Sequence, residues 1–395
     1  MRMRLLALVL CLCTIFGLCG CAVSEEYRFV NPTESYSFEI TEPPQTSPTE
    51  PEPTVAETAP PTLSAGAIAS GLSDEDLVAQ LFLVKCPVGG PVDLLEKHHI
   101  GGLVLFDSDV IDDTPDSLRQ KLNGWQEYAP IPLLVAVDEE GGCVSRLSSN
   151  PNFRSEPFGR IRDIYYEGGL IALRQSEAEK AQLLKRSGIN GNLAPVCDVV
   201  SEENGFMASR SLFQTAKITG NAIAAMVETM QQNQVGAVLK HFPGYGNLSG
   251  DTHTGEVLDT RSKEFLKAND FVPFRQGIQA GAGAVMVGHS IVRELDTASP
   301  ASLSAEIHRI LREELGFNGV IMTDDLMMGA ITKHYDEGEA AVQAVLAGND
   351  LLLTAWSEHQ YDAVLEALQA GRISRDALVA SATRVIQWKM DLGLL

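Results

Sequence analysis

The chain has 395 residues, 45% of them apolar and 21% charged, which is enough apolar material for a sizeable buried core. Its 52 acidic and 30 basic side chains give a formal charge of −22. This charge argues against nucleic-acid binding, which requires clustered Lys and Arg, and an anionic membrane face would repel it as well. We therefore expect neutral or small ligands, and no stretch of the sequence suggests a nucleic-acid or protein docking surface.

The first 21 residues have the pattern of an export signal. The basic start MRMR precedes the apolar run Leu5–Leu18, which is typical of a secretory signal and too short to span a bilayer comfortably. The run ends in Leu18-Cys19-Gly20-Cys21, which resembles a bacterial lipobox, with Cys21 as the residue that would carry the lipid. We expect an exported lipoprotein, anchored to the outer face of the cytoplasmic membrane. A plain secretory signal cleaved nearby is the alternative.

Residues 22–66 differ in composition from the rest of the chain. They are rich in Pro, Thr, Ser and Glu, which predicts a disordered linker that acts as a spacer, with a Pro-rich ligand for a partner domain as the alternative. Residues 67–395 are predicted to form one domain. This part contains Cys86, Cys143 and Cys197, and an odd number of cysteines without a C-x-x-C pair indicates neither a disulfide framework nor a zinc site.

Eight short apolar runs follow in chain order, separated by segments of helical periodicity. Such runs are typical of strands buried on both faces. They are Gln80–Lys85, Gly101–Phe106, Pro132–Val137, Gly188–Leu193, Gly236–His241, Ala284–His289, Asn318–Thr323 and Asp350–Thr354. The predicted helices include Leu170–Ser187, Thr215–Asn233, Arg261–Ala280, Ser304–Leu315 and Glu339–Ala347, and several end next to a glycine. This alternation predicts an α/β fold, a (β/α)8 TIM-type barrel, with an open doubly wound sheet as the alternative.

Polar and ionisable residues gather where these runs end. DEEGG, which begins at Asp138, follows the third run, Lys240-His241 end the fifth, His289 ends the sixth, and Asp324-Asp325 follow the seventh. In a barrel of this type, the C-terminal ends of all strands face one mouth, where active sites are built. Charged residues beside buried strands are costly unless they are paired, so their recurrence favours a functional site.

The segment 240–253 (KHFPGYGNLSGDTH) is the densest of these clusters. Its glycines suggest a dinucleotide loop, but the residues after them are turn-like, whereas pyrophosphate binding needs a helix there. Asp251 and His253 could ligate a metal together with His241 and His289. They could also form a hydrogen-bonded pair in which the carboxylate raises the basicity of the imidazole. A loop whose histidines only bond backbone groups is the third possibility.

Asp324 and Asp325 follow the buried run VIMT. Adjacent residues on a strand point to opposite faces, so we expect only one of them to enter the mouth and the other to cap the next helix. A carboxylate at a barrel mouth opposite an Asp–His pair would suit retaining glycoside hydrolysis, which needs a nucleophile and a separate acid/base. The usual retaining pair is two carboxylates, and here a His charged by its Asp partner would replace the second.

From about Leu72 to the C-terminus, the sequence resembles glycoside hydrolase family 3, specifically its single-domain bacterial β-N-acetylglucosaminidases. The resemblance is carried by LSDEDLVAQLFLV, GGLVLF, LLVAVDEEGGCVSRL, NLAPVCDV, SRSLF, LKHFPGYGNLSGDTHTG, MVGHSIV and GVIMTDDLMMGAI, in the order of the family. Its most specific part is KHFPG followed by D-x-H, which in this subfamily marks a His–Asp acid/base on a flexible loop. The resemblance implies that 67–395 is a family 3 catalytic barrel.

Residue by residue, the resemblance implies Asp324 as the nucleophile, His253 as the general acid/base and Asp251 as the partner of His253. It further assigns substrate contacts to Asp138, Arg146, Arg210, Lys240 and His241. The implied activity is that of a retaining exo-β-N-acetylglucosaminidase, which removes terminal β-linked N-acetylglucosamine from peptidoglycan or chitin-type fragments. The reaction needs no metal or organic cofactor.

Two positions depart from the family pattern. Cys143 stands where Arg is usual, and Tyr245 stands where His is common. Neither position is expected to perform the chemistry, but the missing guanidinium could change what binds on the aglycone side. Because a neutral His hinders an incoming anion less than a Glu would, phosphorolysis is an alternative to hydrolysis. A β-glucosidase and a lipoprotein that binds wall glycans without cleaving them are the further alternatives.

Overall fold

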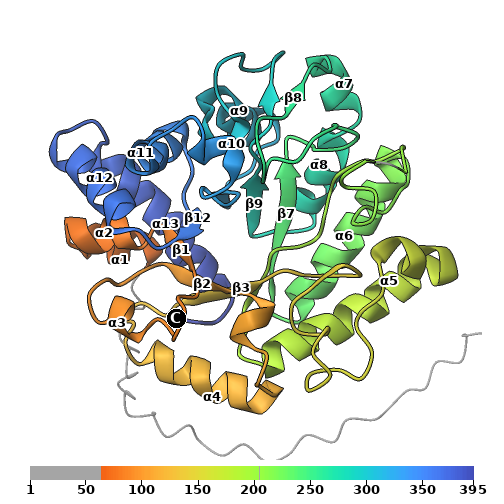
Figure 1. Cartoon of the computed structure of the whole chain (residues 1–395), viewed down its shortest axis with the longest axis horizontal. Coiled ribbons are helices and arrows are strands. Elements are labelled where there is room, and N and C mark those ends of the chain that lie inside the picture. Colours follow the sequence, from red (N-terminus) through yellow and green to blue (C-terminus); the bar gives the residue numbers. More distant parts are fainter. Residues whose placement is uncertain (1–63, 204) are drawn as a thin grey trace, which may run out of the picture. The chain divides into compact units, whose positions relative to one another are not determined.

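The computed structural model describes residues 64–203 and 205–395, in which eight parallel strands form one sheet (Figure 1). The predicted export signal and most of the predicted spacer lie outside these residues. The strands are β1 (Phe82–Lys85), β2 (Gly102–Leu105), β3 (Leu134–Val137), β6 (Gly191–Asn192), β7 (Gly236–Phe242), β9 (Ala284–Val287), β11 (Val320–Thr323) and β12 (Leu352–Ala355). Each overlaps one of the eight predicted runs, so the strand prediction is confirmed.

The sheet closes into a barrel. Its strand order is β11-β9-β7-β6-β3-β2-β1-β12, so the first and last strands of this order are the two edges. Backbone hydrogen bonds join these edges, from Thr323 N–H to the Leu351 carbonyl at 3.1 Å and from Leu326 N–H to the Leu353 carbonyl at 2.9 Å. The TIM-type barrel is therefore confirmed, and the open doubly wound sheet is excluded.

Helices follow the strands along the chain and pack around the barrel. They are α1 (Ala65–Gly71), α2 (Asp74–Ala79), α3 (Val92–Leu95), α4 (Pro115–Gln126), α5 (Ile161–Arg186), α6 (Ala216–Gln232), α7 (Lys263–Ala268), α8 (Phe271–Gln279), α9 (Ala305–Arg309), α10 (Gly329–Thr332), α11 (Glu337–Ala347), α12 (Glu358–Gln369) and α13 (Arg375–Asp391). Helix α1 begins at Ala65, two residues before the predicted start of the domain. The part of the chain that the structure describes contains no helix long and apolar enough to cross a membrane.

Three helix predictions need correction. The predicted helix Arg261–Ala280 is divided into α7 and α8, and the buried Asp270 between them accepts a hydrogen bond from Arg261 at 2.8 Å. Helix α5 begins nine residues earlier than predicted and is kinked at Gly168 and Gly169, the latter with a φ of +60°. The predicted helix Ser304–Leu315 becomes α9 followed by a π-helical turn at Ile310–Glu314.

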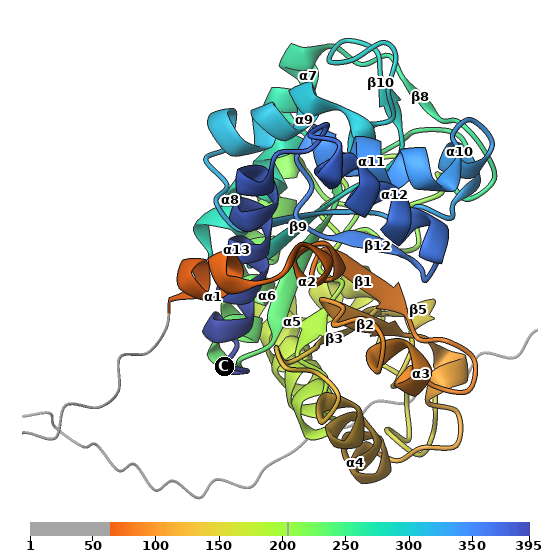
Figure 2. The ribbon, with the colours of Figure 1, turned by 90° about the vertical axis from the view of Figure 1, so that its left-hand side faces the viewer.

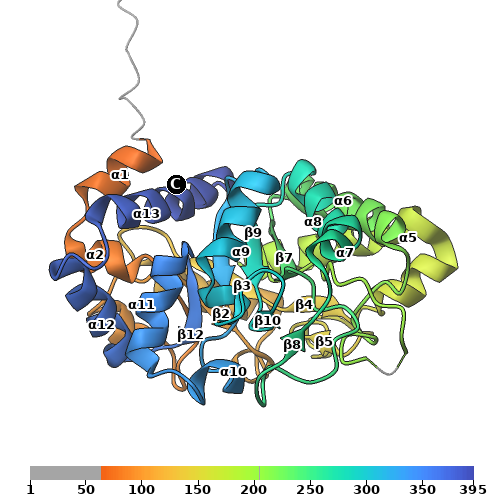
Figure 3. The ribbon, with the colours of Figure 1, turned by 90° about the horizontal axis from the view of Figure 1, so that it is seen from above.

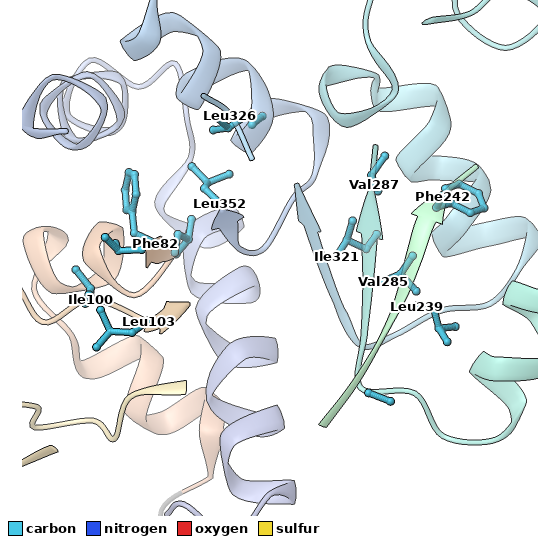
Figure 4. Close-up of a cluster of buried hydrophobic side chains, with 14 of the residues drawn as sticks. Phe82, Ile100, Leu103, Leu239, Phe242, Val285, Val287, Ile321, Leu326 and Leu352 are labelled. Atoms are coloured by element: carbon cyan, nitrogen blue, oxygen red, sulfur yellow. The ribbon is translucent and has the colours of Figure 1, made fainter. Parts of the chain in front are cut away.

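The alternation of side chains along each strand produces two apolar cores. Phe82, Leu103 and Leu352 point outward and pack with the surrounding helices, as Figure 4 shows for several strands. Their neighbours Leu83 and Val104 point inward and fill the barrel. This two-residue period explains why each run is apolar throughout, since both faces of the strand are buried.

The N-terminal end of the barrel is plugged by the last helix. Val385, Trp388 and Leu392 of α13 belong to the same buried cluster as the inward-facing strand residues. An added Cβ at Gly283 would lie 2.1 Å from the Trp388 indole nitrogen, so the ring fits only because this position is glycine. Figures 2 and 3 show α1 and α13 at one end and α10 and β8 (Leu258–Asp259) at the other. The C-terminal end is therefore the one left for a mouth.

Short elements after the strands surround this mouth. The chain after β3 forms an antiparallel hairpin of β4 (Glu139–Gly141) and β5 (Val144–Ser145). The chain after β7 reaches β8, which pairs in parallel with β10 (Ile291–Val292) from the segment after β9. Asp138, Arg146, Asp251 and His253, four of the predicted site residues, lie in these loops.

Candidate active site

A cavity of about 450 Å³ lies at the C-terminal ends of the barrel strands. Seven of the predicted catalytic and substrate-binding residues line it: Asp138, Arg146, Arg210, Lys240, His241, His253 and Asp324. The eighth, Asp251, contacts His253. The structure thus brings together residues that are up to 186 positions apart in the sequence, counted from Asp138 to Asp324.

Asp324 follows the last residue of β11 and is held by its own turn. Its Oδ1 accepts a hydrogen bond from the Asp325 N–H at 2.8 Å. Burial opposes ionisation of this carboxyl, but the neighbouring His241 and Lys240 and the Asp325 N–H outweigh it and lower the pKa of Asp324 below its ordinary value. The carboxylate is therefore ionised at neutral pH, as a nucleophile must be.

Asp251 and His253 form a pair on the loop between β7 and β8. Nδ1 of His253 lies 2.7 Å from Oδ1 of Asp251, and the same oxygen accepts the His253 backbone N–H at 2.9 Å. An Asp on Nδ1 fixes the tautomer and leaves Nε2 for proton transfer. The His253 side chain is 60% exposed, and its ring lies 6.1 Å from that of Phe206, another residue of the cavity wall.

A buried network of charges forms the floor of the cavity. Lys240 Nζ lies 2.5 Å from Asp138 Oδ1 and 2.6 Å from Glu140 Oε1. Arg210 binds both oxygens of Glu140, at 2.7 and 2.9 Å. Burial alone would raise the pKa of Glu140, but Lys240 and Arg210 hold it well below its usual value. Burial also opposes the charge on Lys240, yet Asp138 and Glu140 raise its pKa. Lys240 and Glu140 are therefore charged, and the network offers fixed positions for sugar hydroxyls and an amide.

His241 is positioned by an aspartate that the sequence analysis did not single out. Nδ1 of His241 lies 2.8 Å from Oδ2 of the buried Asp198, and Nε2 lies 3.4 Å from Arg210. Asp198 lies six residues after the end of β6, so a search of strand ends did not reach it; the isolated bridge between Val196 and Lys240 places its segment beside β7. Glu140 was likewise noticed only as part of DEEGG, and its role as the partner of Lys240 and Arg210 was missed.

Arg146 reaches the cavity from the segment that begins with β5. Its guanidinium lies 5.3 Å from the centre of the Phe106 ring and 3.7 Å from Asp107 Oδ1. Within the described residues, its Nε is buried and has no hydrogen-bond partner. Cys143, where the family usually has Arg, also lines the cavity and lies 3.6 Å from the Ser209 hydroxyl.

The prediction for Asp325 was wrong. Both Asp324 and Asp325 line the cavity, and Asp325 forms an ion pair with Lys85, the last residue of β1. Its Oδ1 accepts the Met327 N–H at 3.0 Å, which closes a turn, whereas α10 is preceded by Met328 without a side-chain cap. The strand alternation fails here because the chain leaves the strand at Thr323.

The metal and nucleotide alternatives lack support in this geometry. His289 bonds the Ser302 hydroxyl at 2.7 Å and the Asp325 carbonyl at 2.9 Å, so both of its ring nitrogens are occupied. Burial lowers the pKa of His289, in keeping with a neutral ring. Over 64–203 and 205–395, no three His, Cys, Asp or Glu residues form a group that could hold a metal ion. After Gly250 the next helix begins only at Lys263, too late to direct its N-terminus at a phosphate.

The predicted lipidation site, Cys21, lies outside the described residues.

Comparison with known proteins identifies the family of the chain. The glycosyl hydrolase family 3 N-terminal domain matches residues 75–388, which is more than half of the chain. The chain belongs to glycosyl hydrolase family 3.

Several named relatives match most of this chain. A beta-hexosaminidase of Nitrosomonas eutropha is 31% identical over 284 residues, which cover 70% of this chain and 80% of the relative. Beta-hexosaminidase LpqI of Mycobacterium tuberculosis is 31% identical over 329 residues, covering 80% and 83%. The solved structure of M. tuberculosis LpqI matches with a TM-score of 0.76 at 30% identity, over 83% of this chain and 96% of that one.

A family 3 beta-N-acetylglucosaminidase from Paenibacillus sp. also has a similar structure, with a TM-score of 0.77 at 30% identity. The match covers 82% of this chain but only 63% of that chain, so the Paenibacillus protein is considerably longer than the matched part. As a family 3 member, the present chain is a glycoside hydrolase.

Proposed function

We propose that this family 3 hydrolase is a retaining exo-β-N-acetylglucosaminidase that uses Asp324 as its nucleophile and His253 as its acid/base. One observation carries the proposal: Asp324, after β11, and His253, on the loop after β7, line the same cavity, and His253 is paired with Asp251 at 2.7 Å. A retaining glycosidase needs these two functions on separate groups. The names of the relatives, beta-hexosaminidase and beta-N-acetylglucosaminidase, support the choice of sugar.

In the first step, an oxygen of Asp324 attacks the anomeric carbon, and the bond from this carbon to the leaving oxygen breaks. Protonated His253 gives its proton to that oxygen, and Asp251 stabilises the positive ring beforehand. In the second step, neutral His253 takes a proton from water, whose oxygen attacks the anomeric carbon and releases Asp324. Two displacements at one carbon retain the configuration.

The buried charges on the floor of the cavity suit a polar pyranose. Asp138 can accept hydrogen bonds from two hydroxyls, while Lys240 and Arg210 can donate to others or to the acetamido carbonyl. Because these groups already bond one another, the sugar enters a network whose geometry is set before binding. Arg146 and His241 lie in the same wall and supply further donors.

The proposal includes a location and a source of substrate. The apolar run before Cys21 and the Pro-rich segment after it favour a lipid-anchored protein outside the cytoplasmic membrane, where peptidoglycan fragments are available. Metabolic labelling with an alkyne fatty acid would test the anchor. The wild-type chain should carry the label, the Cys21→Ala chain should not, and an unlabelled wild type would contradict the lipoprotein.

The activity is tested by release of a chromogenic phenol from its β-N-acetylglucosaminide by the full chain. We expect the Asp324→Ala and His253→Ala variants to lose about 10⁴-fold and about 10²-fold or more in kcat, respectively. His359→Ala is the matched control, because His359 is also 60% exposed and also pairs with an aspartate, Asp336 at 2.9 Å, but lies on α12 outside the cavity. It should keep wild-type activity.

Three further measurements separate the alternatives. A 5-fluoro N-acetylglucosaminyl fluoride should add the mass of one sugar to the peptide that contains Asp324, and a label elsewhere would contradict the nucleophile. Added phosphate should leave the free sugar as product, whereas sugar 1-phosphate would establish phosphorolysis. Faster release from a β-glucoside would indicate a glucosidase, and no release from either glycoside by folded protein would favour the binding lipoprotein.

A further inference from the structure

The loop that carries Asp251 and His253 is held on two sides by groups outside the proposed chemistry. On one side lies Tyr245, whose side chain is buried. Its hydroxyl donates to the Gly250 carbonyl at 2.8 Å and accepts the Thr252 N–H at 3.2 Å. Burial raises the pKa of Tyr245, which keeps the hydroxyl protonated and able to donate.

On the other side lies the first turn of α10, which follows Asp324 in the chain. The Gly329 N–H donates to the His253 carbonyl and the Ala330 N–H donates to the Thr252 carbonyl, each at 3.0 Å. The first N–H groups of a helix have no partner within the helix, so the carbonyls of this loop satisfy them. Lys333 Nζ, at the end of α10, adds a bond to the Thr254 carbonyl at 2.5 Å.

Thr252 lies between these two anchors and is only 3% exposed. Its N–H is bound by Tyr245 and its carbonyl by Ala330, so both backbone groups of the residue before His253 are fixed. At Gly329 there is no room for a side chain beside this loop. A Cβ there would lie 2.8 Å from the His253 carbonyl oxygen and 3.0 Å from the Thr254 carbonyl carbon, so any side chain would push the loop away.

We propose that Tyr245 and the first turn of α10 clamp the acid/base loop, which makes Tyr245 and Gly329 positioning residues for His253. The inference rests on the proposed role of His253 and extends it. Because α10 directly continues the segment that holds Asp324, the clamp sets the acid/base relative to the nucleophile. The clamp also gives a function to Tyr245, which stands at a position where this chain departs from the family pattern.

The test compares Tyr245→Phe and Gly329→Ala in the full chain with Gly255→Ala. Tyr245→Phe removes only the hydroxyl. Gly255 belongs to the same loop, but a Cβ there would meet only Lys333 Nζ, at 3.9 Å, so it provides a matched control. If Gly329→Ala does not fold, Tyr245→Phe still carries the test.

Two substrates reveal whether acid/base catalysis is the function lost. N,N′-diacetylchitobiose has a poor leaving group that needs protonation, whereas the 2,4-dinitrophenyl β-N-acetylglucosaminide does not. We expect kcat on the disaccharide to fall about 10-fold in Tyr245→Phe and about 10²-fold in Gly329→Ala, because small displacements of a catalytic group cost this much. Azide should raise turnover of the dinitrophenyl substrate by both variants and give the glycosyl azide, and Gly255→Ala should behave as wild type.

His253→Ala in the same assays separates the failure of the clamp from the failure of the acid/base assignment. If His253→Ala shows the leaving-group dependence and azide rescue while Tyr245→Phe and Gly329→Ala match the wild type, the clamp is wrong and the acid/base role stands. Equal losses on both substrates without azide rescue would also overturn the clamp, since they would reflect general damage. If His253→Ala itself matches the wild type, both proposals fail.

Discussion

Two fully buried lysines lie at opposite ends of the barrel in different electrostatic surroundings. Lys240 in β7 lies at the mouth between Asp138 and Glu140, which raise its pKa although burial opposes this. Lys389 in α13 lies at the plugged end and donates to the neutral amide oxygen of Gln80 at 2.9 Å. There burial acts alone and lowers the pKa of Lys389 to about 7.

The difference shows what distinguishes a functional charge from a structural one in this fold. At the mouth, two carboxylates offset the desolvation of the ammonium group, and the resulting network remains available to a ligand. At the plugged end, the methylene chain of the lysine packs in the apolar core and its amine makes one hydrogen bond, but its charge opposes folding. The same substitution at the two positions should therefore have opposite effects.

Lys240→Met should have the largest effect on stability. It leaves Asp138 without its 2.5 Å partner and Glu140 with Arg210 alone, and removal of one member of a buried ion pair costs about 3–5 kcal/mol. The free energy of unfolding from urea titration at pH 7 measures this. Unchanged stability would contradict the pairing, and retained activity would contradict the role of Lys240 in binding sugar.

Trp388→Ala should have a similar or slightly smaller effect at the other end. The indole fills the barrel floor against Gly236 and Gly283, and its removal leaves a cavity that costs about 3–4 kcal/mol. Because Trp388 is remote from the mouth, kcat per folded molecule should not change. A fall in kcat that matches the loss of stability would show that the two ends are coupled rather than independent.

Lys389→Met should have the smallest effect and the opposite sign. The pKa of Lys389 is about 7 in the folded protein against 10.5 for a free lysine. Between these pH values the unfolded chain binds more protons, so the stability of the wild type rises with pH, and the penalty is complete below pH 7. We expect the variant to be about 1–2 kcal/mol more stable at pH 6, after allowing for the lost bond to Gln80.

Most of this advantage should disappear by about pH 10, where the wild-type amine is neutral in the folded state and the pH approaches the value of 10.5 at which a free lysine loses half of its charge. Urea titrations at pH 6, 8 and 10 would follow the change. A destabilised variant at pH 6, with no change on raising the pH, would mean that Lys389 has a charged partner and that the contrast with Lys240 is wrong.

Much of the fold was predictable because the relevant signals are local. An apolar run flanked by helical periodicity predicts a buried strand by itself, and β6 was found in GINGNL although only Gly191 and Asn192 pair there. Helix ends were less predictable. At the break between α7 and α8, Asp270 bonds Arg261, which lies nine residues away in the sequence. After β11, Asp325 pairs with Lys85, which is distant in the sequence.

The sequence by itself determined the eight strands and the polar residues at their ends, several of which face the mouth, because strand period and strand ends are properties of short segments. Only the tertiary structure decided which of these residues pair. Lys240 pairs with Asp138 across 102 positions, Arg210 pairs with Glu140 across 70, and His241 pairs with Asp198. Likewise, the segment that carries His253 is held by Tyr245 and by α10. Such pairs depend on the charge, the burial and the distance of side chains that come together only in the folded chain, so no local sequence pattern predicts them.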